Sequence, residues 1–582
     1  MASGAVQTGV YTSPFPDIQL ASSSIFTHFL NTDKEGYVGH HPAHWPAYIE
    51  SFSGTAISRA QLRTHALSLG YALQHHPHYP AKRGDVTMLY SPNSVSFPLV
   101  VFGCIAAGVR VTLANAAYNP RELEHQYKDS GATLIFTFEE GLPTVLAMLK
   151  EMGIENANDR VIVCGKGTKW VGGPDVPRMH PEMTYMEDLL AQGTLEHEEK
   201  FEGEDAHETA FLCYSSGTTG LAKGVETTHQ NLTSVVEMVM ESLPDLTQKT
   251  ASGVLPFFHI YGAVNLFLLP LRAGFATAVQ PRFDPEQFCA NIQRYRVAFC
   301  LLVPPIMNML ARHPVVEKYD LSSLQVIISG AAPLPVALTK IVRGRLRSLK
   351  CFAPIVQGYG LTETSPVTHL VPHFQATEEN IGSIGVLMPS LQCRLVGEDN
   401  LDVEAGQPGE MWIKGPTVMK GYHNRAAETK DTITADGWLK TGDVAIRDSE
   451  GFYTIVDRKK ELIKYKGFQV PPAELEDILC GHPEIIDAAV IAVYDDEQAT
   501  ELPRGYVVSK RQLTTTEERV AFEGEIKDWV KGRVAYHKQL RGGVSVIEAV
   551  PKSAAGKILR KDLRAKAKLE REQASPAIAV KA

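Results

Sequence analysis

Strand-like apolar runs alternate with helix-like segments over most of the chain, and this pattern restricts the possible folds strongly. Runs at 85–90, 110–113 and 133–138 predict strands, and the segments 98–108 and 122–129 between them predict helices. A helix between successive strands is the crossover that parallel strands need. Further strands are expected at 211–214, 253–255, 277–279 and 326–328. The alternation therefore predicts an α/β protein with parallel sheets.

The length of 582 residues exceeds what one hydrophobic core can stabilise, so at least two domains are expected. After residue 386 the chain changes to short β-like runs separated by glycine turns, as at 406–409, which predicts a small β subdomain. A charged stretch at 457–460 lacks bulky apolar residues and is interpreted as a linker. We therefore predict a large N-terminal domain over residues 1–456 and a small C-terminal domain over 457–582.

The C-terminal region has a mixed pattern of helices and strands. Helices are predicted at 472–479 and 522–534, and strands at 488–493 and 505–509. These elements suffice for a small α+β domain of about 120 residues. The charged tail from Lys561 onward is expected to fray, because chain ends are poorly ordered unless they are tied down.

Charge and cysteine content exclude several classes of protein. The net charge is −9, whereas a nucleic-acid-binding protein usually has a basic excess. The eight cysteines are scattered without a C-x-x-C pair, which is typical of reduced intracellular proteins and not of a disulfide or zinc framework. The apolar stretch at 97–109 is shorter than the roughly 20 residues that cross a membrane. Neither the first residues nor the final Val-Lys-Ala resembles a secretory or Ser-Lys-Leu-type signal.

From these features we expect a cytoplasmic protein with no transmembrane segment and no nucleic-acid partner. Nothing in the sequence determines the oligomeric state, and a monomer is the default expectation. The expected partners are small molecules, and the sequence motifs indicate their chemical class.

The segment 214–224 follows a predicted strand and contains hydroxyl residues, three glycines and one lysine. Glycines let the backbone approach a ligand closely, and successive backbone N–H groups that point inward bind anions. Serine and threonine hydroxyls add donors, and Lys223 adds a positive charge for a polyphosphate. The Walker A spacing is absent, so the common ATPase fold is not implied. Composition alone also fits a flexible polar loop.

Five motifs occur in an order that resembles the adenylate-forming superfamily, which includes acyl-CoA synthetases, 4-coumarate–CoA ligases, beetle luciferases and peptide-synthetase adenylation domains. The motifs lie at 215–224, 357–363, 440–443, 457–469 and 551–557. This resemblance implies that ATP and a carboxylic acid form an acyl-adenylate, whose acyl group then passes to the thiol of coenzyme A. It also implies that the small C-terminal domain is mobile and rotates about a hinge near Lys460 between the two steps.

The resemblance assigns ATP and Mg²⁺ mainly to the first three motifs. Glu363 is a hard oxygen ligand suited to Mg²⁺, and Asp443 can accept hydrogen bonds from both ribose hydroxyls. Tyr359 offers a π-face for adenine, and Thr362 can bind the α-phosphate. The implied metal ligands are Glu363 and Thr219. The residues implied to bind ATP are Ser215, Ser216, Gly217, Thr218, Thr219, Lys223, Gln357, Gly358, Tyr359, Thr362, Asp443, Arg458 and Lys460.

The resemblance also assigns residues to catalysis and to coenzyme A. Lys557, in the loop 551–557, is implied to bridge the substrate carboxylate and the α-phosphate, where a cation offsets the repulsion between two anions. Coenzyme A is assigned to Lys466, Gly467 and Arg282, although relatives commonly have lysine at the position of Arg282. The residues implied in catalysis are Lys557, His259, Lys464, Gln469, Thr219 and Glu363, with Lys464 and Gln469 serving the thioester step.

The acid-binding residues come from a Phe-His segment at 256–262 and from small residues in two later loops. A lone histidine between aromatic residues is more often a core residue, but the ordered motifs favour placing His259 beside the acyl-adenylate. Small residues leave room for a flat ring or an extended chain. The implied acid-binding residues are His259, Tyr261, Gly330, Ala331, Ala332, Gly360, Pro366 and Val367.

Three functions remain open at this point. Segments 258–261 and 463–469 favour a ligase of the 4-coumarate type, but Trp412 stands where plant ligases carry cysteine, and Thr-Ser-Pro at 364–366 replaces their Ala-Gly-Pro. A medium- or long-chain fatty acyl-CoA ligase, or a luciferase-like oxidase, is the second alternative. The third is a non-catalytic scaffold, which the retained charged residues argue against. An adenylation module for a carrier protein is disfavoured by the coenzyme A segment.

Overall fold

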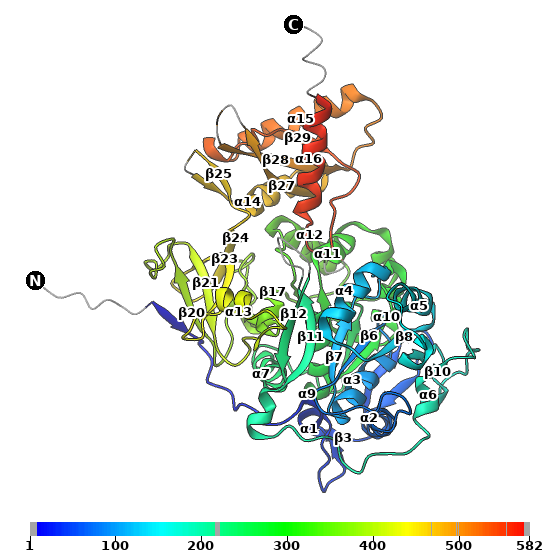
Figure 1. The fold of residues 1–582 in the computed structure, drawn as a ribbon. Helices are drawn as coiled ribbons and strands as arrows, with labels where there is room; N and C mark the ends of the chain where they lie inside the picture. Colours follow the sequence, from blue (N-terminus) through cyan, green and yellow to red (C-terminus); the bar gives the residue numbers. More distant parts are fainter. Residues whose placement is uncertain are drawn as a thin grey trace, which may run out of the picture.

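Alternating strands and helices build two large, mostly parallel sheets, as the sequence predicts. In Figure 1 these sheets form part of a large body, and the orange and red C-terminal segment forms a smaller unit beside it. The predicted α/β class, with a small β subdomain and a small α+β C-terminal unit, is confirmed. The computed structural model describes residues 9–215, 222–466, 468–495, 498, 500–553 and 556–574.

The first large sheet has eight strands, and six neighbouring strands of it are parallel. Strands β12 and β22 extend it in antiparallel orientation. In spatial order its strands are β10 (Thr184–Tyr185), β9 (Val161–Cys164), β8 (Leu134–Phe138), β6 (Val86–Tyr90), β7 (Arg110–Ala114), β11 (Thr209–Ser215), β12 (Lys223–Thr228) and β22 (Gly421–Tyr422). Its connecting helices are α3 (Ser96–Ala106), α4 (Pro120–Ser130), α5 (Leu142–Glu151) and α6 (Met186–Leu189).

The second large sheet has nine strands, of which six neighbours are again parallel. Its strands in spatial order are β19 (Val386–Leu387), β18 (Val367–Leu370), β17 (Ile355–Gly360), β16 (Val326–Ser329), β15 (Val297–Leu302), β13 (Thr250–Gly253), β14 (Ala276–Val279), β4 (Pro46–Glu50) and β5 (Ala56–Ser58). The helices of this part are α1 (Ile25–Leu30), α2 (Arg59–Gln74), α7 (His229–Met240), α8 (Ile260–Gly262), α9 (Leu269–Ala273), α10 (Pro285–Arg294), α11 (Pro304–Arg312) and α12 (Val336–Ser348).

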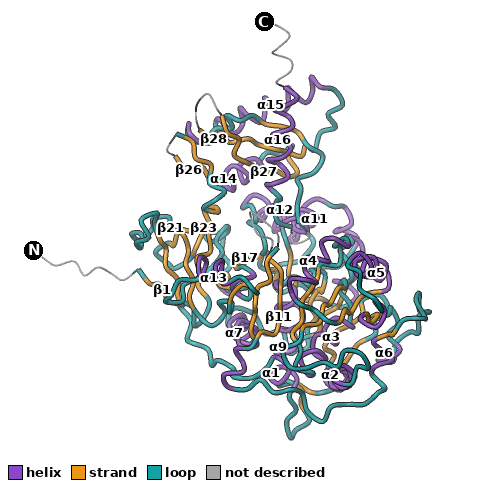
Figure 2. The backbone as a smooth tube through the Cα atoms, viewed as in Figure 1, coloured by secondary structure: helices purple, strands orange, loops and turns teal. Residues whose placement is uncertain are grey.

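One hydrophobic core joins the two large sheets. Helix α3 is central to it, because every one of its residues is buried. Its Phe97 and Phe102 rings contact Phe257 and Phe267 of the chain that leads to the second sheet, with centroid separations of 5.7 and 6.3 Å. Figure 2 shows helices surrounding the strands of this body. The shared core fixes the two sheets relative to each other, so the strand ends that they present form one rigid surface.

A five-stranded antiparallel sheet forms the predicted β subdomain. Its strands in order are β1 (Val10–Thr12), β20 (Gln392–Val396), β21 (Gly409–Lys414), β23 (Leu439–Arg447) and β24 (Tyr453–Arg458), with α13 (Ala426–Thr432) between β22 and β23. Strand β24 pairs with β23 through Arg458, which lies opposite Asp443. Asp457 and Arg458 therefore belong to this sheet and not to a linker, and the connection to the C-terminal unit follows them.

The C-terminal unit has its own hydrophobic core, around residues such as Leu475, Val507 and Ile526. Its elements are the hairpin β25 (Ile463–Tyr465) and β26 (Phe468–Val470), the three-stranded sheet of β27 (Ile485–Asp495), β28 (Thr500–Ser509) and β29 (Val544–Val546), and the helices α14 (Pro472–Cys480), α15 (Thr516–Lys531) and α16 (Arg560–Ala574). Helix α16 occupies part of the tail that was expected to fray. It is anchored because Leu563 is buried and Arg560 forms an ion pair with Glu476. Within the described ranges, no helix combines the length and apolar content needed to cross a membrane.

Candidate active site

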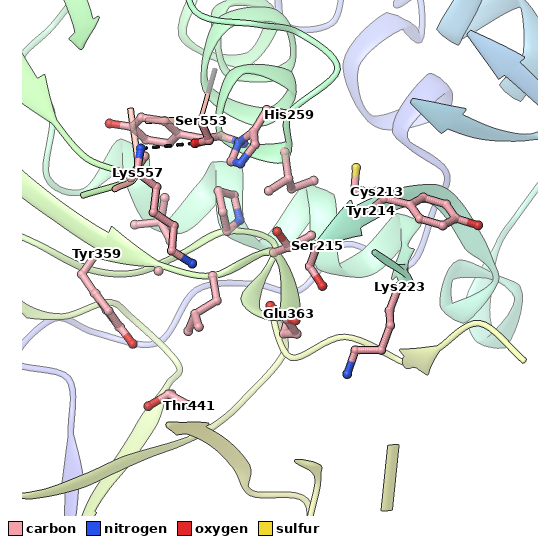
Figure 3. A pocket seen from close by; sticks show the side chains of 18 of the residues that line it. Cys213, Tyr214, Ser215, Lys223, His259, Tyr359, Glu363, Thr441, Ser553 and Lys557 are labelled. Atoms are coloured by element: carbon pink, nitrogen blue, oxygen red, sulfur yellow. Dashed lines mark hydrogen bonds between the residues drawn. The ribbon is translucent and has the colours of Figure 1, made fainter. Parts of the chain in front are cut away.

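A cavity of about 600 Å³ lies where the two large sheets, the β subdomain and the C-terminal unit meet. Figure 3 shows side chains from all these parts pointing into it. The strands of both sheets lead their carboxyl ends to this place, where ligands bind in open parallel sheets. Sequence-predicted residues that line the cavity are Ser215, Lys223, His259, Tyr261, Ala331, Gly358, Tyr359, Gly360, Thr362, Glu363, Pro366, Val367, Arg458, Lys460 and Lys557.

The predicted phosphate loop connects β11 to β12 at one side of the cavity. Ser215, the last residue of β11, pairs with Lys223, the first residue of β12. The Lys223 ammonium lies 3.9 Å from the ring centroid of Tyr422, within the range of a cation–π interaction. Ser216, Gly217, Thr218 and Thr219 lie outside the described residues. Lys223, the charged residue at the end of this segment, therefore lies at the cavity wall.

Glu363 lies just after β17, near the Lys223 end of this segment. The Tyr422 hydroxyl donates a hydrogen bond of 2.9 Å to Oε1 of Glu363, so one tyrosine contacts both Lys223 and Glu363. Strand β22 brings Tyr422 there by pairing with β12. The sequence interpretation missed Tyr422. No local pattern marks it, because the contact depends on sheet pairing between residues almost 200 positions apart.

Tyr359, Asp443 and Arg458 form a hydrogen-bonded group at another wall. The Tyr359 hydroxyl donates to Oδ2 of Asp443 at 2.6 Å, and Nε of Arg458 lies 3.2 Å from Oδ1. Burial raises the pKa of Asp443, while the Arg458 guanidinium and the Tyr359 hydroxyl act in the opposite direction. Asp443 itself is only 4% exposed and is not among the lining residues, so Tyr359 and Arg458 are the members of this group that line the cavity.

Lys557 enters the cavity from the C-terminal unit, through a turn that packs against the body. Gly556 has a φ of +78°, and a Cβ atom there would lie only 3.1 Å from the Pro305 ring at the start of α11. The Lys557 amide donates to the Ser553 hydroxyl at 3.2 Å, which is the dashed line in Figure 3. Ala554 and Ala555, between them, lie outside the described residues. A glycine at 556 therefore allows the loop to carry Lys557 close to the body.

Burial lowers the pKa of both Lys557 and His259. Burial, together with the nearby Arg458 charge, lowers the pKa of Lys557 from 10.5 to about 8, although the Asp443 and Glu363 carboxylates oppose this effect. Burial, with the Lys557 charge as a second cause, lowers the pKa of His259 from 6.5 to about 4. His259 is therefore neutral near pH 7, and its Nδ1 accepts a hydrogen bond from the Tyr261 amide at 3.2 Å.

The remaining end of the cavity is largely apolar. Besides predicted residues, it is lined by side chains that the sequence interpretation did not assign to the site, among them Val239, Phe258, Leu301, Ile328 and Leu370. Gly330 lies beneath Tyr261, because a Cβ atom at Gly330 would be 2.5 Å from the Tyr261 hydroxyl oxygen. The backbone at Gly360 packs directly against Pro366. A Cβ atom at position 360 would be only 1.6 Å from the Pro366 carbonyl oxygen. Ala332 is half-buried and is not among the lining residues.

Other predicted residues lie away from the cavity. Lys464 and Gln469 face each other across the β25–β26 hairpin, and Nε2 of Gln469 donates to Oε1 of Glu398 at 3.0 Å. Gln357 uses its Oε1 to accept a hydrogen bond from the Leu334 amide at 3.0 Å, in a small neighbouring cleft. Arg282 is exposed at the surface, as is Lys466, whose amide donates to Thr500 at 2.8 Å. Gly467 lies outside the described residues.

The chain matches two families over most of its length. Residues 35–423 match the AMP-binding enzyme family, and residues 474–557 match the AMP-binding enzyme C-terminal domain. A 4-coumarate–CoA ligase from Narcissus pseudonarcissus is 37% identical over 529 residues, which cover 90% of this chain and 89% of the relative. A probable 4-coumarate–CoA ligase from Dictyostelium discoideum is 36% identical, with 83% of this chain and 86% of the relative covered.

Solved structures agree on the fold. The anthranilate–CoA ligase AuaEII in complex with anthranoyl-AMP superposes with a TM-score of 0.80 at 21% identity, covering 95% of this chain and 99% of that one. ATP-bound MatB from Rhodopseudomonas palustris gives a TM-score of 0.78 at 23% identity, covering 94% and 99%. The chain therefore belongs to the AMP-binding enzyme family and is an acid–thiol ligase of the 4-coumarate–CoA ligase-like, AMP-forming type.

Proposed function

We propose that this ATP-dependent acid–CoA ligase acts on 4-coumarate or a related hydroxycinnamic acid through an acyl-adenylate. The observation that carries the proposal is the position of Lys557. It extends from the C-terminal unit into the cavity that Glu363, Tyr359 and Arg458 also line, and the last two of these contact the buried Asp443, which is not itself a lining residue. A cation and a carboxylate of the metal-binding type thus face one space large enough for a nucleotide and an acid. The carboxylate proposed for ribose, Asp443, lies directly behind two of the residues that line this space.

In the proposed first step, adenine lies near Tyr359, ribose near Asp443 and the phosphates towards Lys223. A carboxylate oxygen of the acid attacks the α-phosphorus, and pyrophosphate leaves. Lys557 would offset the repulsion between the two reacting anions, and neutral His259 would line the path of the acid. Glu363 offers an oxygen donor of the kind that Mg²⁺ prefers. When bound, this metal would supply positive charge to the leaving pyrophosphate.

In the proposed second step, the thiol of coenzyme A attacks the acyl carbonyl and AMP leaves. Lys464 and Gln469, the residues proposed for this step, lie outside the cavity, where Gln469 is bonded to Glu398. The C-terminal unit would therefore have to rotate, and Lys460 lies in the turn where the chain passes between the two parts. Rotation would withdraw Lys557 and bring the β25–β26 hairpin to the cavity.

Two observations support an aromatic acid. Curated relatives that cover most of the chain carry the name 4-coumarate–CoA ligase, and the apolar end of the cavity includes Phe258 and Tyr261 beside the small Ala331. The aliphatic residues Leu301, Ile328 and Leu370 also line this end, and they favour a second candidate, a medium- or long-chain fatty acid. Both candidates use the same adenylation chemistry and differ only in the acid.

Pyrophosphate release with ATP and coenzyme A, measured over a panel of acids, tests the proposal. The panel should contain 4-coumarate, caffeate, phenylacetate, benzoate, hexanoate and palmitate. We expect a thioester from 4-coumarate and caffeate but not from hexanoate or palmitate. Activity with the two fatty acids alone would establish the second candidate. A protein that released no pyrophosphate with any acid would contradict both candidates.

A further inference from the structure

Helix α4 contacts both ends of the hairpin that carries the phosphate loop. His125 and Asp129 are four residues apart and therefore lie on one face of this helix. Nε2 of His125 donates to the Ala222 carbonyl at 2.9 Å, just before β12 begins. Oδ2 of Asp129 accepts a hydrogen bond of 2.8 Å from the Tyr214 hydroxyl, near the end of β11. One helix face thus binds the chain before and after residues 216–221.

The helix that holds these two side chains is itself firmly placed. Asn119 and Glu122 form a capping box at its first turn, and Gly131 ends it in the left-handed conformation. Leu123 is buried in the core beneath the helix. Gln126 donates to the Thr112 hydroxyl at 2.9 Å and so ties the helix to β7, the neighbour of β11. Bonds from this helix to the hairpin therefore start from a rigid support.

Asp129 also reaches a third element around the loop. Its Oδ1 accepts a hydrogen bond of 2.8 Å from Nη2 of Arg425. Arg425 follows β22, whose Tyr422 contacts both Lys223 and Glu363. The Asp129 side chain is only 14% exposed, and each of its carboxylate oxygens is engaged by one of these partners. A largely buried carboxylate with charged and hydroxyl donors makes stronger hydrogen bonds than an exposed one.

Tyr214, on β11, contacts the neighbouring strand β12 of the hairpin. Its ring lies over the backbone of Gly224 on the neighbouring strand, because a Cβ atom at Gly224 would be 3.2 Å from the ring. The ring also meets His125 edge to face, with centroids 6.3 Å apart. Fixing the Tyr214 hydroxyl therefore fixes both strands from which the loop projects.

We propose that Asp129, assisted by His125, is a positioning residue for the phosphates of ATP. Asp129 fixes Tyr214 and His125 fixes Ala222, the described residues on either side of the segment that binds the phosphates in the proposed function, and a pre-organised position of these residues strengthens ATP binding. This inference rests on the proposed function, in which the loop between β11 and β12 binds the phosphates. It adds residues of α4 that touch neither ATP nor the acid.

Two variants test the inference with little change of shape. Tyr214→Phe removes one hydroxyl, and Asp129→Asn keeps the side-chain size but loses the charge. We expect kcat/KM for ATP in pyrophosphate exchange to fall about tenfold in each, the size of one lost hydrogen bond to a charged group, with most of the change in KM. Thioester formation from supplied acyl-adenylate should be unchanged, because that step does not need the phosphate loop.

The chain offers a matched control at Tyr185, on the opposite edge strand β10 of the same sheet. Its hydroxyl donates to Oε1 of Glu139 at 2.8 Å, so Tyr185→Phe loses the same kind of bond far from the loop. We expect Tyr185→Phe to lower the melting temperature without changing KM for ATP. The inference is wrong if Tyr214→Phe and Asp129→Asn behave like this control. It is also wrong if they weaken both half-reactions equally, since that would indicate a merely structural role.

Direct binding separates this inference from the proposed function. Calorimetric titration with ATP needs no turnover, and we expect about tenfold weaker binding by Tyr214→Phe than by the wild type. Unchanged ATP affinity in this variant would overturn the inference. A wild type that bound ATP but never released pyrophosphate would contradict the proposed function, while weaker ATP binding by the variant would still support the role of Asp129.

Discussion

Lys557 is the residue at which the two proposed half-reactions can be separated most directly. It lies in the cavity with Glu363 and Arg458, whereas the residues proposed for the thioester step lie outside. We expect Lys557→Ala to lower acyl-adenylate formation by about 100-fold or more, because a transition-state charge contact is lost. Thioester formation from supplied acyl-adenylate should be spared. A variant that lost both activities equally would show that Lys557 does not act in adenylation alone.

The protonation of Lys557 gives a pH prediction. Burial and Arg458 lower its pKa from 10.5 to about 8, so the lysine loses its charge as pH rises through about 8. If only the charged form assists the attack, kcat/KM for adenylation should fall above pH 8, well below the range of an ordinary lysine. Arginine stays charged in this range, so the residual activity of Lys557→Arg should lack this decline. An identical decline in the arginine variant would assign it to another group.

Some residues at or near the site could be predicted from the sequence, and others could not. Lys223, Glu363 and Lys557 stand in recognisable motifs, and the structure places all three at one cavity. Tyr422 and Asp129 stand in no motif that we recognised, because their contacts arise from sheet pairing and from a helix face. Such contacts join positions far apart in the chain, and a single sequence carries no local signal for them.

The loop after β16 passes very close to the Tyr261 side chain at Gly330. A methyl group at Gly330 would lie 2.5 Å from the Tyr261 hydroxyl oxygen, so Gly330→Ala must displace that ring, which lines the cavity. We expect a several-fold higher KM for the acid and an unchanged KM for ATP. The double variant with Tyr261→Phe lacks the nearest clashing atom but keeps Cζ, which would lie 2.7 Å from the added methyl group, so it should recover only part of the lost affinity. If KM for ATP rose as well, or the double variant recovered nothing, Tyr261 would not explain the effect.

Most elements were predictable because their apolar periodicity is local. The strands β6, β7 and β11 and the helices α3 and α4 lie within a few residues of the expected positions. Strand β13 lies at Thr250–Gly253, somewhat before the predicted 253–255. Helix α15 begins at Thr516, earlier than the predicted 522, because a capping box at Thr515 and Glu518 starts an exposed charged turn without an apolar pattern.

Two further elements depend on tertiary contacts. Strand β24 extends through the charged Asp457 and Arg458 because Arg458 pairs with Asp443 on β23. Helix α16 persists in a charged tail because Arg560 pairs with the buried Glu476. A charged sequence at either place suggests a linker or a frayed end. The stabilising partners lie elsewhere in the chain, so only the folded structure reveals them.

For the whole molecule, the arrangement of the C-terminal unit is suited to the first half-reaction. Lys557 lies in the cavity, and Gln469 is held on the body by Glu398 at 3.0 Å. Lys459 adds an ion pair of 2.9 Å with Glu410. These contacts are exposed and individually weak, so they can be broken when the unit rotates. The body and the C-terminal unit also have separate hydrophobic cores, so rotation need not disturb either.

The proposed rotation can be tested at Lys460, which follows the end of β24. In this turn the Lys459 amide donates to the Gly442 carbonyl at 2.8 Å and the Glu461 amide to the Arg458 carbonyl at 2.9 Å. Proline at 460 would restrict φ to about −65° and also limit its preceding residue. We expect adenylation by Lys460→Pro to stay within about threefold of that by Lys460→Ala, while thioester formation falls about 100-fold or more relative to it.

Lys460→Ala is the control for this prediction, because it removes the side chain but leaves the backbone free to turn. Both variants lose the Lys460 side chain, which lines the cavity, so the ratio of the two half-reactions is what is compared. Lys460→Ala should keep the wild-type ratio, whereas Lys460→Pro should stop after the acyl-adenylate, which can be trapped and quantified by mass spectrometry. Equal losses of the two half-reactions in Lys460→Pro would mean that the substitution damages the cavity itself. Unchanged thioester formation would mean that the large backbone change takes place at another residue of the turn, because a proline cannot make it.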